Sequence, residues 1–335
     1  MLDIPRLKRI RLSRYPVSQR IMGRFLCLNY ESVPGVKIRF EGTENIPDEP
    51  CIFAMNHTDR YNYFPFQYKL WRIKNRFTAT WVKGKYYENA AVATFMEKMN
   101  QLPTISRGYL ITRDFLEVLK RAPTSEEYSR LRDWVDESYE IGATAHREES
   151  FWESLPRALF DENRNVLGRE FQPEKETYPD YVNATFQLMM KLFVGLNQQA
   201  HDVGLDILIF PQGTRSKRLL PSHTGIAELA FYLKCPVVPI GCNGSDQVYP
   251  GSSPFGKKGE CIYRIGEAIQ YGSIPEYKLD EEFDPFTKEA EIKFGSHFES
   301  FAEAVTRRIN PLLDEAYQID DQSKLPDDRE AKRFL

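Results

Sequence analysis

The sequence predicts an α/β fold with a mixed, largely parallel β-sheet flanked by helices and with an inserted helical lobe. Two observations lead to this class. Short apolar runs typical of buried strands alternate with segments of helical periodicity along most of the 335 residues. Between about 108 and 200, by contrast, Glu, Arg, Leu, Trp and Tyr recur at helical spacing, which indicates a long helical part of the chain.

The first part of the chain has the pattern of strands joined by helices. Residues 36–41 alternate in polarity, and 50–55 form a short apolar run that ends before Asn56. We expect strands at 36–41, 50–55, 77–82 and 102–106, with helices near 63–73 and 89–99.

The same periodicities predict the elements of the lobe and of the last part of the chain. In and after the lobe, helices are expected at 126–139, 148–159 and 181–199, with a polar loop at 164–179. Strands then return at 206–210, 237–241 and 260–265, with helices at 225–233 and at 288–316, the second interrupted by Gly295. The organisation is therefore a basic segment at 1–35, a main domain at 36–319 and a charged, frayed tail at 320–335.

Composition excludes several classes of protein. The net charge of −3 gives no general reason to expect a nucleic-acid partner. The five cysteines include no C-x-x-C pair, and the histidines have no metal-ligand spacing, so neither a disulfide framework nor a metal site is expected, and a reducing compartment fits best. We also expect no membrane-spanning helix and no signal peptide.

The N-terminal segment is locally basic. Between Arg6 and Arg24 all charged residues are Lys or Arg, and apolar residues lie among them. Such a segment can lie on an anionic bilayer, where each basic residue contributes about 1 kcal/mol. A solvated tail or a helix packed on its own domain would have the same composition.

Three short segments that follow predicted strands carry reactive side chains: 56–62 (NHTDRYN), 102–107 (LPTISR) and 210–216 (FPQGTRS). Ligand sites of α/β sheets gather beyond the carboxyl ends of parallel strands. In the first segment, His57 has the chemistry of a general base near neutral pH, and Asp59 is its local carboxylate. A histidine at a strand end is also often structural, and Asp59 has the alternative role of a helix cap.

The third segment offers backbone amides, hydroxyls and a guanidinium. Gly213, Thr214, Arg215 and Ser216 are followed at once by two further basic residues. Arginine can bind phosphate through two parallel hydrogen bonds, so the turn is a candidate phosphate or oxyanion cradle. It lacks the P-loop pattern, and the alternative is a solvated basic loop.

Taken in order, Asn56-His57, Ser106-Arg107, the 210–216 segment and 235–240 (CPVVPI) resemble the four acyltransferase blocks of the glycerolipid (glycerol-3-phosphate and lysophosphatidic acid) acyltransferase superfamily. Flanking stretches at 40–47 and 225–230, and Lys83 before the second block, agree with this resemblance. It covers about residues 36–266, and 36–319 would then be an acyltransferase domain with a glycerol-3-phosphate acyltransferase-like fold.

The resemblance implies a role for each matching position. His57 would be the base that deprotonates the acceptor hydroxyl, and Arg107 and Arg215 would hold the acceptor phosphate. Thr214 and Ser216 would lie nearby, Gly213 would allow close backbone approach, and Lys83 would be a further substrate-binding residue. The fourth block would shape the acyl channel, although 237–240 is also a plain buried strand.

Two positions depart from the family pattern. The family has an aspartate five residues after the histidine, where this chain has Asn62. It usually has glutamate after the proline of the third block, where this chain has Gln212. An Asn oxygen can still orient His57 and keeps Asn62 a catalytic candidate, but it cannot stabilise an imidazolium. At a triad aspartate such a change lowers kcat about 10⁴-fold.

The resemblance implies an acyltransferase (EC 2.3.1.-) of phospholipid biosynthesis. The donor would be acyl-CoA or acyl-carrier protein, the acceptor a lysophospholipid or related phosphate-bearing lipid, and no cofactor would be needed. A cytoplasmic protein, peripheral on the inner face of the membrane, is expected. The alternatives are a catalytically weak relative that binds lipid or an acyl carrier, or an acyltransferase for an amine or another polar lipid. The connection from Arg107 to Phe210, between the second and third blocks, is longer than the resemblance suggests, which implies an inserted helical lobe at about 115–180. This lobe would cap the acyl tunnel, bind a carrier or mediate self-association.

Overall fold

The computed structural model describes the chain except residues 33–34, 142–150, 152–153, 321–322 and 325–335. Its centre is a seven-stranded sheet in the order β1-β9-β8-β2-β7-β3-β4. The strands are β1 (Val36–Glu41), β2 (Ile52–Met55), β3 (Thr78–Lys83), β4 (Gln101–Thr104), β7 (Asp206–Ile209), β8 (Val237–Asn243) and β9 (Gly259–Ile265). Among the described strands of this sheet, only β8 and β9 pair antiparallel, which confirms the mixed, largely parallel sheet.

Helices cover both faces of this sheet because its central strands bury side chains on each side. Along β2, Ile52 and Ala54 join one apolar cluster while Phe53 and Met55 join the other. The helices α9 (Tyr178–Asp202), α10 (Gly225–Leu233) and α12 (Lys288–Ile309) supply the first cluster, and α2 (Val17–Cys27) and α3 (Tyr63–Lys74) supply the second. The short helix α4 (Ala90–Lys98) lies between β3 and β4 in the sequence.

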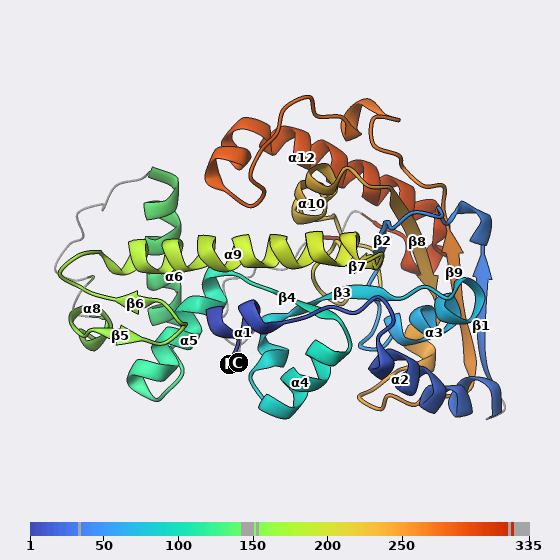
Figure 1. The fold of residues 1–335 in the computed structure, drawn as a ribbon, viewed down its shortest axis with the longest axis horizontal. Helices are drawn as coiled ribbons and strands as arrows, with labels where there is room; N and C mark the ends of the chain where they lie inside the picture. The colour runs from blue at the N-terminus through green and yellow to red at the C-terminus, as the bar shows by residue number, and fades with distance from the viewer. Residues whose placement is uncertain (33–34, 142–150, 152–153, 321–322, 325–335) are drawn as a thin grey trace.

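The lobe extends beyond the β4 edge of the sheet, to the left in Figure 1. It contains α5 (Arg107–Leu119), α6 (Ser125–Ile141), α8 (Ala158–Asp161) and the first turns of α9. The long helix α9 connects the lobe to the sheet, and it begins at a capping box formed by Thr177 and Asp180. In the lobe core, the Arg164 guanidinium binds the fully buried Asp114 carboxylate at 2.6 Å and faces the Phe171 ring.

Three expectations need correction or restriction. The expected loop at 164–179 contains a small hairpin of β5 (Arg164–Asn165) and β6 (Glu170–Phe171), because Phe171 is buried in the lobe core. Helix α12 runs through Gly295 without interruption and ends at Ile309, and no atom lies within 4 Å of the position of a Cβ at Gly295. Of the helix expected at 148–159, five residues lie outside the described ones, 154–157 are not helical, and α8 begins only at Ala158; most of the tail also lies outside the described residues.

The basic N-terminal segment forms two helices with different environments. The first, α1 (Ile4–Arg9), buries Ile4 and Leu7 between the lobe and the sheet, and the Arg6 guanidinium binds Glu97 of α4 at 2.8 Å. The second, α2, packs on α3 but leaves one apolar side exposed. Among the described residues no helix is both long and apolar enough to cross a bilayer.

Candidate active site

The first and third sequence segments meet at the carboxyl edge of neighbouring strands. His57 follows β2, the 210–216 turn follows β7, and these two strands pair in parallel. The backbone N–H of Ser216 donates to the carbonyl of His57 at 2.9 Å. The positive charges of Arg215 and Lys83 both act on the imidazole. The structure therefore brings His57, Arg215 and Lys83 together at one edge of the sheet.

The orientation of the His57 ring is determined by a chain of amides. Its Nδ1 lies 3.1 Å from Oδ1 of Asn62, and its ring stacks on Phe210 with centroids 4.0 Å apart. The Asn62 Nδ2 group donates to the carbonyl of Asn56 at 2.9 Å, so Oδ1 is the atom that faces His57. Nδ1 must therefore carry the proton, which leaves Nε2 with the free lone pair that a base needs.

Asn56 is held in turn by the sheet. Its side-chain amide donates to the Cys242 carbonyl at 3.0 Å and accepts from the Cys242 N–H at 2.7 Å. The Asn56 side chain therefore forms the same pair of hydrogen bonds with β8 that the backbone of a neighbouring strand would form. Asn56 is 1% exposed and Asn62 is 0% exposed. In each of them both Oδ1 and Nδ2 have a hydrogen-bond partner, which offsets the desolvation cost of a buried amide.

Gln212 braces the turn on the other side of His57. Its Nε2 donates to the Thr214 carbonyl at 2.9 Å, and its Oε1 accepts from the His57 N–H at 3.4 Å. A glutamate could not donate to the Thr214 carbonyl. Gln212 and Asn62 thus share one arrangement, in which the amide NH₂ group of a buried side chain binds a backbone carbonyl.

Asp59, the carboxylate nearest to His57 in the sequence, forms its hydrogen bonds with other residues. Its carboxylate accepts from the Tyr61 N–H at 2.7 Å and from the Thr58 hydroxyl at 2.9 Å, which closes a tight turn. Burial raises the pKa of Asp59, and no hydrogen bond joins it to the described His57 ring. Asp59 is also not the cap of α3, because Asn62 stands at that position.

The charges near His57 are positive. Burial, followed by the Arg215 and Lys83 charges, lowers the pKa of His57 to about 3, and the Asn62 hydrogen bond only partly opposes this. Arg215 is exposed, and in the described part of the chain it forms no ion pair. Gly213 has φ of 64°, and a Cβ there would lie 2.9 Å from the His223 ring, so this turn requires glycine.

Arg107 lies at the junction of the sheet and the lobe. It begins α5 three residues after Thr104, which is the register partner of Lys83. Its Nε donates to Oδ1 of Asn183 at 2.8 Å, and its guanidinium lies 3.6 Å from the Tyr139 ring centroid and 4.6 Å from that of Phe186. Arg107 is therefore clamped by lobe residues, which sequence reasoning did not predict.

Other supporting residues were also missed. Asn56 was noted only as part of a motif, Gln212 only as a departure, and Asn183 not at all. A polar residue directly after a buried strand, such as Asn56, is a usable signal. Asn183, by contrast, reaches Arg107 from a helix 76 residues away, and no local pattern reports such a contact.

Comparison with known proteins agrees with the resemblance. Residues 187–243 match the family model described as acyltransferase. The crystal structure of the 1-acyl-sn-glycerophosphate (LPA) acyltransferase PlsC from Thermotoga maritima aligns with a TM-score of 0.40 and 14% identity, over 88% of this chain and 78% of that chain. A search of curated proteins found no match. Residues 187–243 contain the third and fourth of the resembling blocks, so this part of the chain is similar to the acyltransferase family.

Proposed function

We propose that the protein transfers a fatty acyl group from acyl-CoA or acyl-carrier protein to a hydroxyl of a phosphate-bearing glycerolipid of the lysophosphatidic acid or glycerol-3-phosphate type. One observation carries the proposal: Nδ1 of His57 lies 3.1 Å from Oδ1 of Asn62, and the charges of Arg215 and Lys83 act on the same ring. In the proposed site Nε2 is the base, and the two cations hold a phosphate. The family-model match at 187–243 supports acyl transfer in general. The donor, the acceptor and the base are the proposed parts.

In the proposed reaction, His57 Nε2 takes the proton of the acceptor hydroxyl as its oxygen attacks the thioester carbonyl carbon. The C–S bond then breaks, and the imidazolium returns the proton to the leaving sulfur, which yields an ester and a free thiol. We expect no acyl-enzyme, because four of the cysteines are buried, and burial raises the pKa of Cys235 and of Cys261 to about 12.

The bound acceptor would compensate for the missing aspartate. Without ligand, the charges of Arg215 and Lys83 disfavour the imidazolium, and the hydrogen-bond partner of the ring is the neutral Asn62 rather than a carboxylate. A phosphate dianion held by these cations would offset their charge and raise the pKa of His57 toward the working range. A phosphate-bearing acceptor therefore suits this site better than an uncharged alcohol.

The test is thiol release from acyl-CoA and from acyl-carrier protein with a panel of acceptors, for the wild type and for His57→Ala. We expect turnover with phosphate-bearing acceptors and a loss of about 10²- to 10⁴-fold in His57→Ala, the usual contribution of a general base. Turnover that survives this substitution would overturn the assignment of the base.

Asn62 also supports a second candidate, an amine acceptor. A neutral amine is a stronger nucleophile than a hydroxyl and needs less help from a base backed by a carboxylate. Release of thiol with amine lipids alone would establish this activity in place of the first. Tight acyl-chain binding without turnover would instead indicate a catalytically weak relative.

We also propose that the protein binds the inner face of the membrane peripherally through α2. Its exposed apolar residues form a stripe at helical spacing, namely Val17, Ile21, Phe25 and Leu28, each at least 50% exposed. The exposed Arg20 and Arg24 flank the stripe, and Phe255 extends it through an edge contact with Phe25 at 5.4 Å. Such an arrangement suits an anionic bilayer interface.

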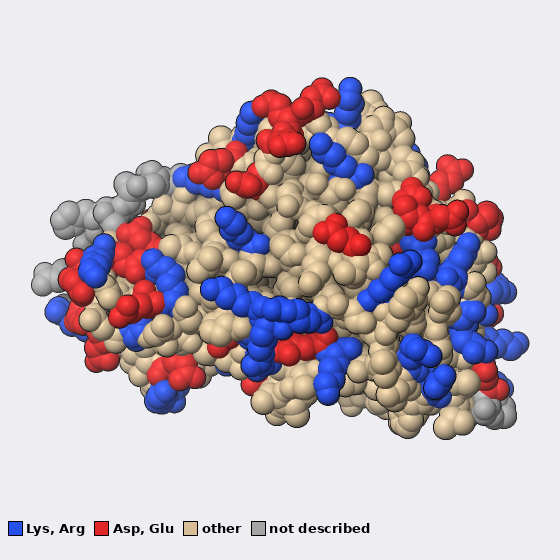
Figure 2. All heavy atoms as spheres, in the orientation of Figure 1, with Lys and Arg blue, Asp and Glu red and all other residues tan. Residues whose placement is uncertain are grey.

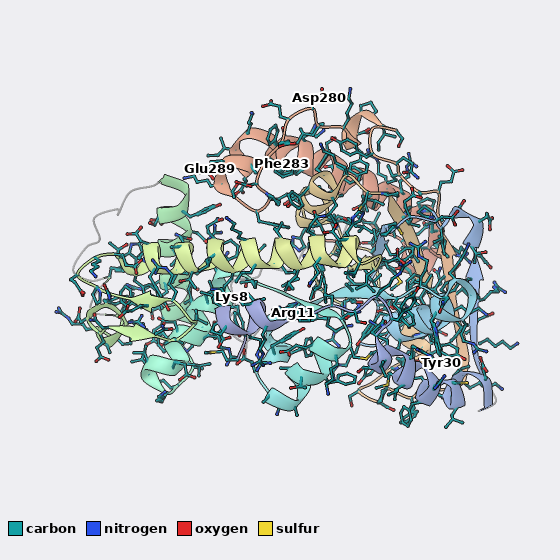
Figure 3. All side chains as sticks on the ribbon, in the orientation of Figure 1. Lys8, Arg11, Tyr30, Asp280, Phe283 and Glu289 are labelled. Carbon is teal, nitrogen blue, oxygen red and sulfur yellow. The ribbon has the colours of Figure 1, made fainter. Side chains whose placement is uncertain are left out.

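Further basic side chains support the proposed membrane contact of α2. Figure 2 shows Lys and Arg side chains on the face where α1 and α2 lie, and Figure 3 places Lys8 and Arg11 at α1. In a sedimentation assay with vesicles containing anionic lipid, Ile21→Ser with Phe25→Ser should weaken binding. Val92→Ser, an exposed apolar position on α4, is the matched control. Equal binding of the double variant and the wild type would rule out α2 as the contact.

A further inference from the structure

Arg107 differs from the most buried arginines in that no acidic residue in the described part of the chain pairs with it. Five arginines with side chains at most 18% exposed each lie within 4 Å of a carboxylate: Arg6, Arg76, Arg113, Arg132 and Arg164. Arg107 is partly buried, and burial lowers its pKa, yet no carboxylate among the described residues forms an ion pair with it. The charge of Asp136 reaches Arg107, but that carboxylate binds Arg132 at 2.5 Å.

The lobe holds this unpaired cation in one orientation. The Asn183 Nδ2 group donates to the Val135 carbonyl of α6 at 3.0 Å, so its Oδ1 faces the Nε of Arg107. Tyr139 stacks on the guanidinium, and the Gln187 amide donates to the Tyr139 hydroxyl at 3.3 Å. A neutral amide thus occupies the place where a carboxylate would neutralise the arginine.

Such an arrangement costs stability unless an anion from outside completes it. A buried, unpaired charge is disfavoured, whereas a guanidinium held by a neutral amide and by aromatic side chains keeps its net charge for a phosphate. Arg107 is also the first residue of α5, a helix of 13 residues whose N-terminal dipole favours an anion. Thr104, three residues earlier, pairs with Lys83, so Arg107 follows a strand that ends at the edge where His57 lies.

We infer that the lobe completes the phosphate site: Asn183 and Tyr139 are positioning residues that hold Arg107 unneutralised for a phosphate monoester of the substrate. This inference rests on the proposed function and adds the lobe to it. The phosphate can belong to the acceptor or to the nucleotide part of acyl-CoA, and the two sources share the same chemistry.

The test replaces the positioning amide and leaves the arginine in place. Asn183→Asp gives Arg107 a carboxylate partner and should raise the KM for the phosphate-bearing substrate at least 10-fold, with kcat changed much less. Asn183→Ala removes the orienting bond without adding charge and should have a smaller effect in the same direction. Gln198→Glu is the control, since it makes the same amide-to-carboxylate change on α9, about 22 Å along the helix axis.

Two substrate pairs identify the source of the phosphate. If it belongs to the acceptor, the KM effect of Asn183→Asp disappears for an acceptor without phosphate. If it belongs to the donor, the effect disappears with an acyl-pantetheine donor in place of acyl-CoA. An unchanged KM for every phosphate-bearing substrate, in an enzyme that turns over, contradicts the inference and leaves the proposed function standing.

A binding measurement separates the inference from the proposed function. Glycerol 3-phosphate and coenzyme A are titrated calorimetrically into the wild type, Asn183→Asp and Gln198→Glu. We expect binding of one of them to weaken at least 10-fold in Asn183→Asp alone. If the wild type binds in this way but shows no turnover, the proposed function fails and the anion site stands. If neither ligand binding nor KM depends on Asn183, the inference is wrong.

Discussion

The lobe core and the candidate active site differ in what lies beside their buried charged or titratable groups. In the lobe, Arg164 and the fully buried Asp114 neutralise each other at 2.6 Å. At the carboxyl edge of the sheet, amides stand beside His57 and Arg107 where carboxylates could stand. A paired charge contributes to the fold, whereas an unpaired one is a cost that a ligand can offset. The contrast separates structural from functional groups within one molecule.

The largest expected effect concerns the ion pair between Arg164 and Asp114 in the lobe. Asp114→Ala leaves Arg164 buried without its partner, and breaking a buried pair in this way costs about 3–5 kcal/mol. Urea denaturation should show this loss in the free energy of unfolding. A loss below ~1 kcal/mol would mean that Arg164 is satisfied by its aromatic neighbours and that the contrast is overstated.

Glu228 of α10 is a largely buried carboxylate that forms no ion pair among the described residues. It accepts from the Phe286 N–H at 2.6 Å, and burial, with the Glu291 charge as a further cause, raises its pKa to about 7. The folded state therefore holds this proton more tightly than the unfolded state. Stability is highest below the unfolded pKa and falls as the pH rises toward 7.

Replacing Glu228 by glutamine removes this penalty. A displacement from 4.5 to about 7 corresponds to a cost on the order of 3 kcal/mol at pH 8. We therefore expect Glu228→Gln to raise the melting temperature at pH 8 and to change it little at pH 4.5. Equal effects at both pH values would show that the carboxylate charge is not the cause.

Asn62→Asp tests whether the active site is built for an amide. The new carboxylate would place an oxygen against the Asn56 carbonyl, which now accepts a hydrogen bond from the Asn62 Nδ2 group. We expect a loss of about 1–3 kcal/mol in stability at neutral pH, the usual cost of an unsatisfied buried polar group. We also expect no gain in kcat. A rise in kcat with unchanged stability would show that the site accepts the aspartate of the family pattern.

The smallest effect is expected for Arg107→Leu. The substitution removes a cation without a carboxylate partner and keeps apolar contact with the Tyr139 and Phe186 rings, so the free energy of unfolding should change by less than about 1 kcal/mol. Substrate binding, measured as KM, should weaken strongly. A large loss of stability without a change in KM would make Arg107 a structural residue like Arg164.

The fold and much of the site could be predicted from the sequence. The strand at 36–41 and the helix at 225–233 have the predicted bounds, because periodicity and turn residues act locally. The pairing of His57 with Asn62 could also be anticipated, since the two residues are five positions apart. The hairpin at 164–171 was missed because its strands have two residues each and are held by burial in the lobe.

The two N-terminal helices show where sequence alone stops. Both are basic and both carry apolar residues, and the sequence could not distinguish a packed helix from a membrane-binding one. The structure buries Ile4 and Leu7 of α1 against the lobe and leaves Ile21 and Phe25 of α2 exposed. Only the neighbours of each helix make this difference.

By itself, the sequence determined the order of strands and helices, the glycine turn after β7 and the chemical nature of the side chains at the strand ends. These depend on backbone preference and on spacing along the chain. The tertiary structure alone decided which charges have partners and that the lobe holds Arg107 through Asn183. Burial and charge pairing are properties of neighbours in space, and those neighbours come from distant parts of the chain.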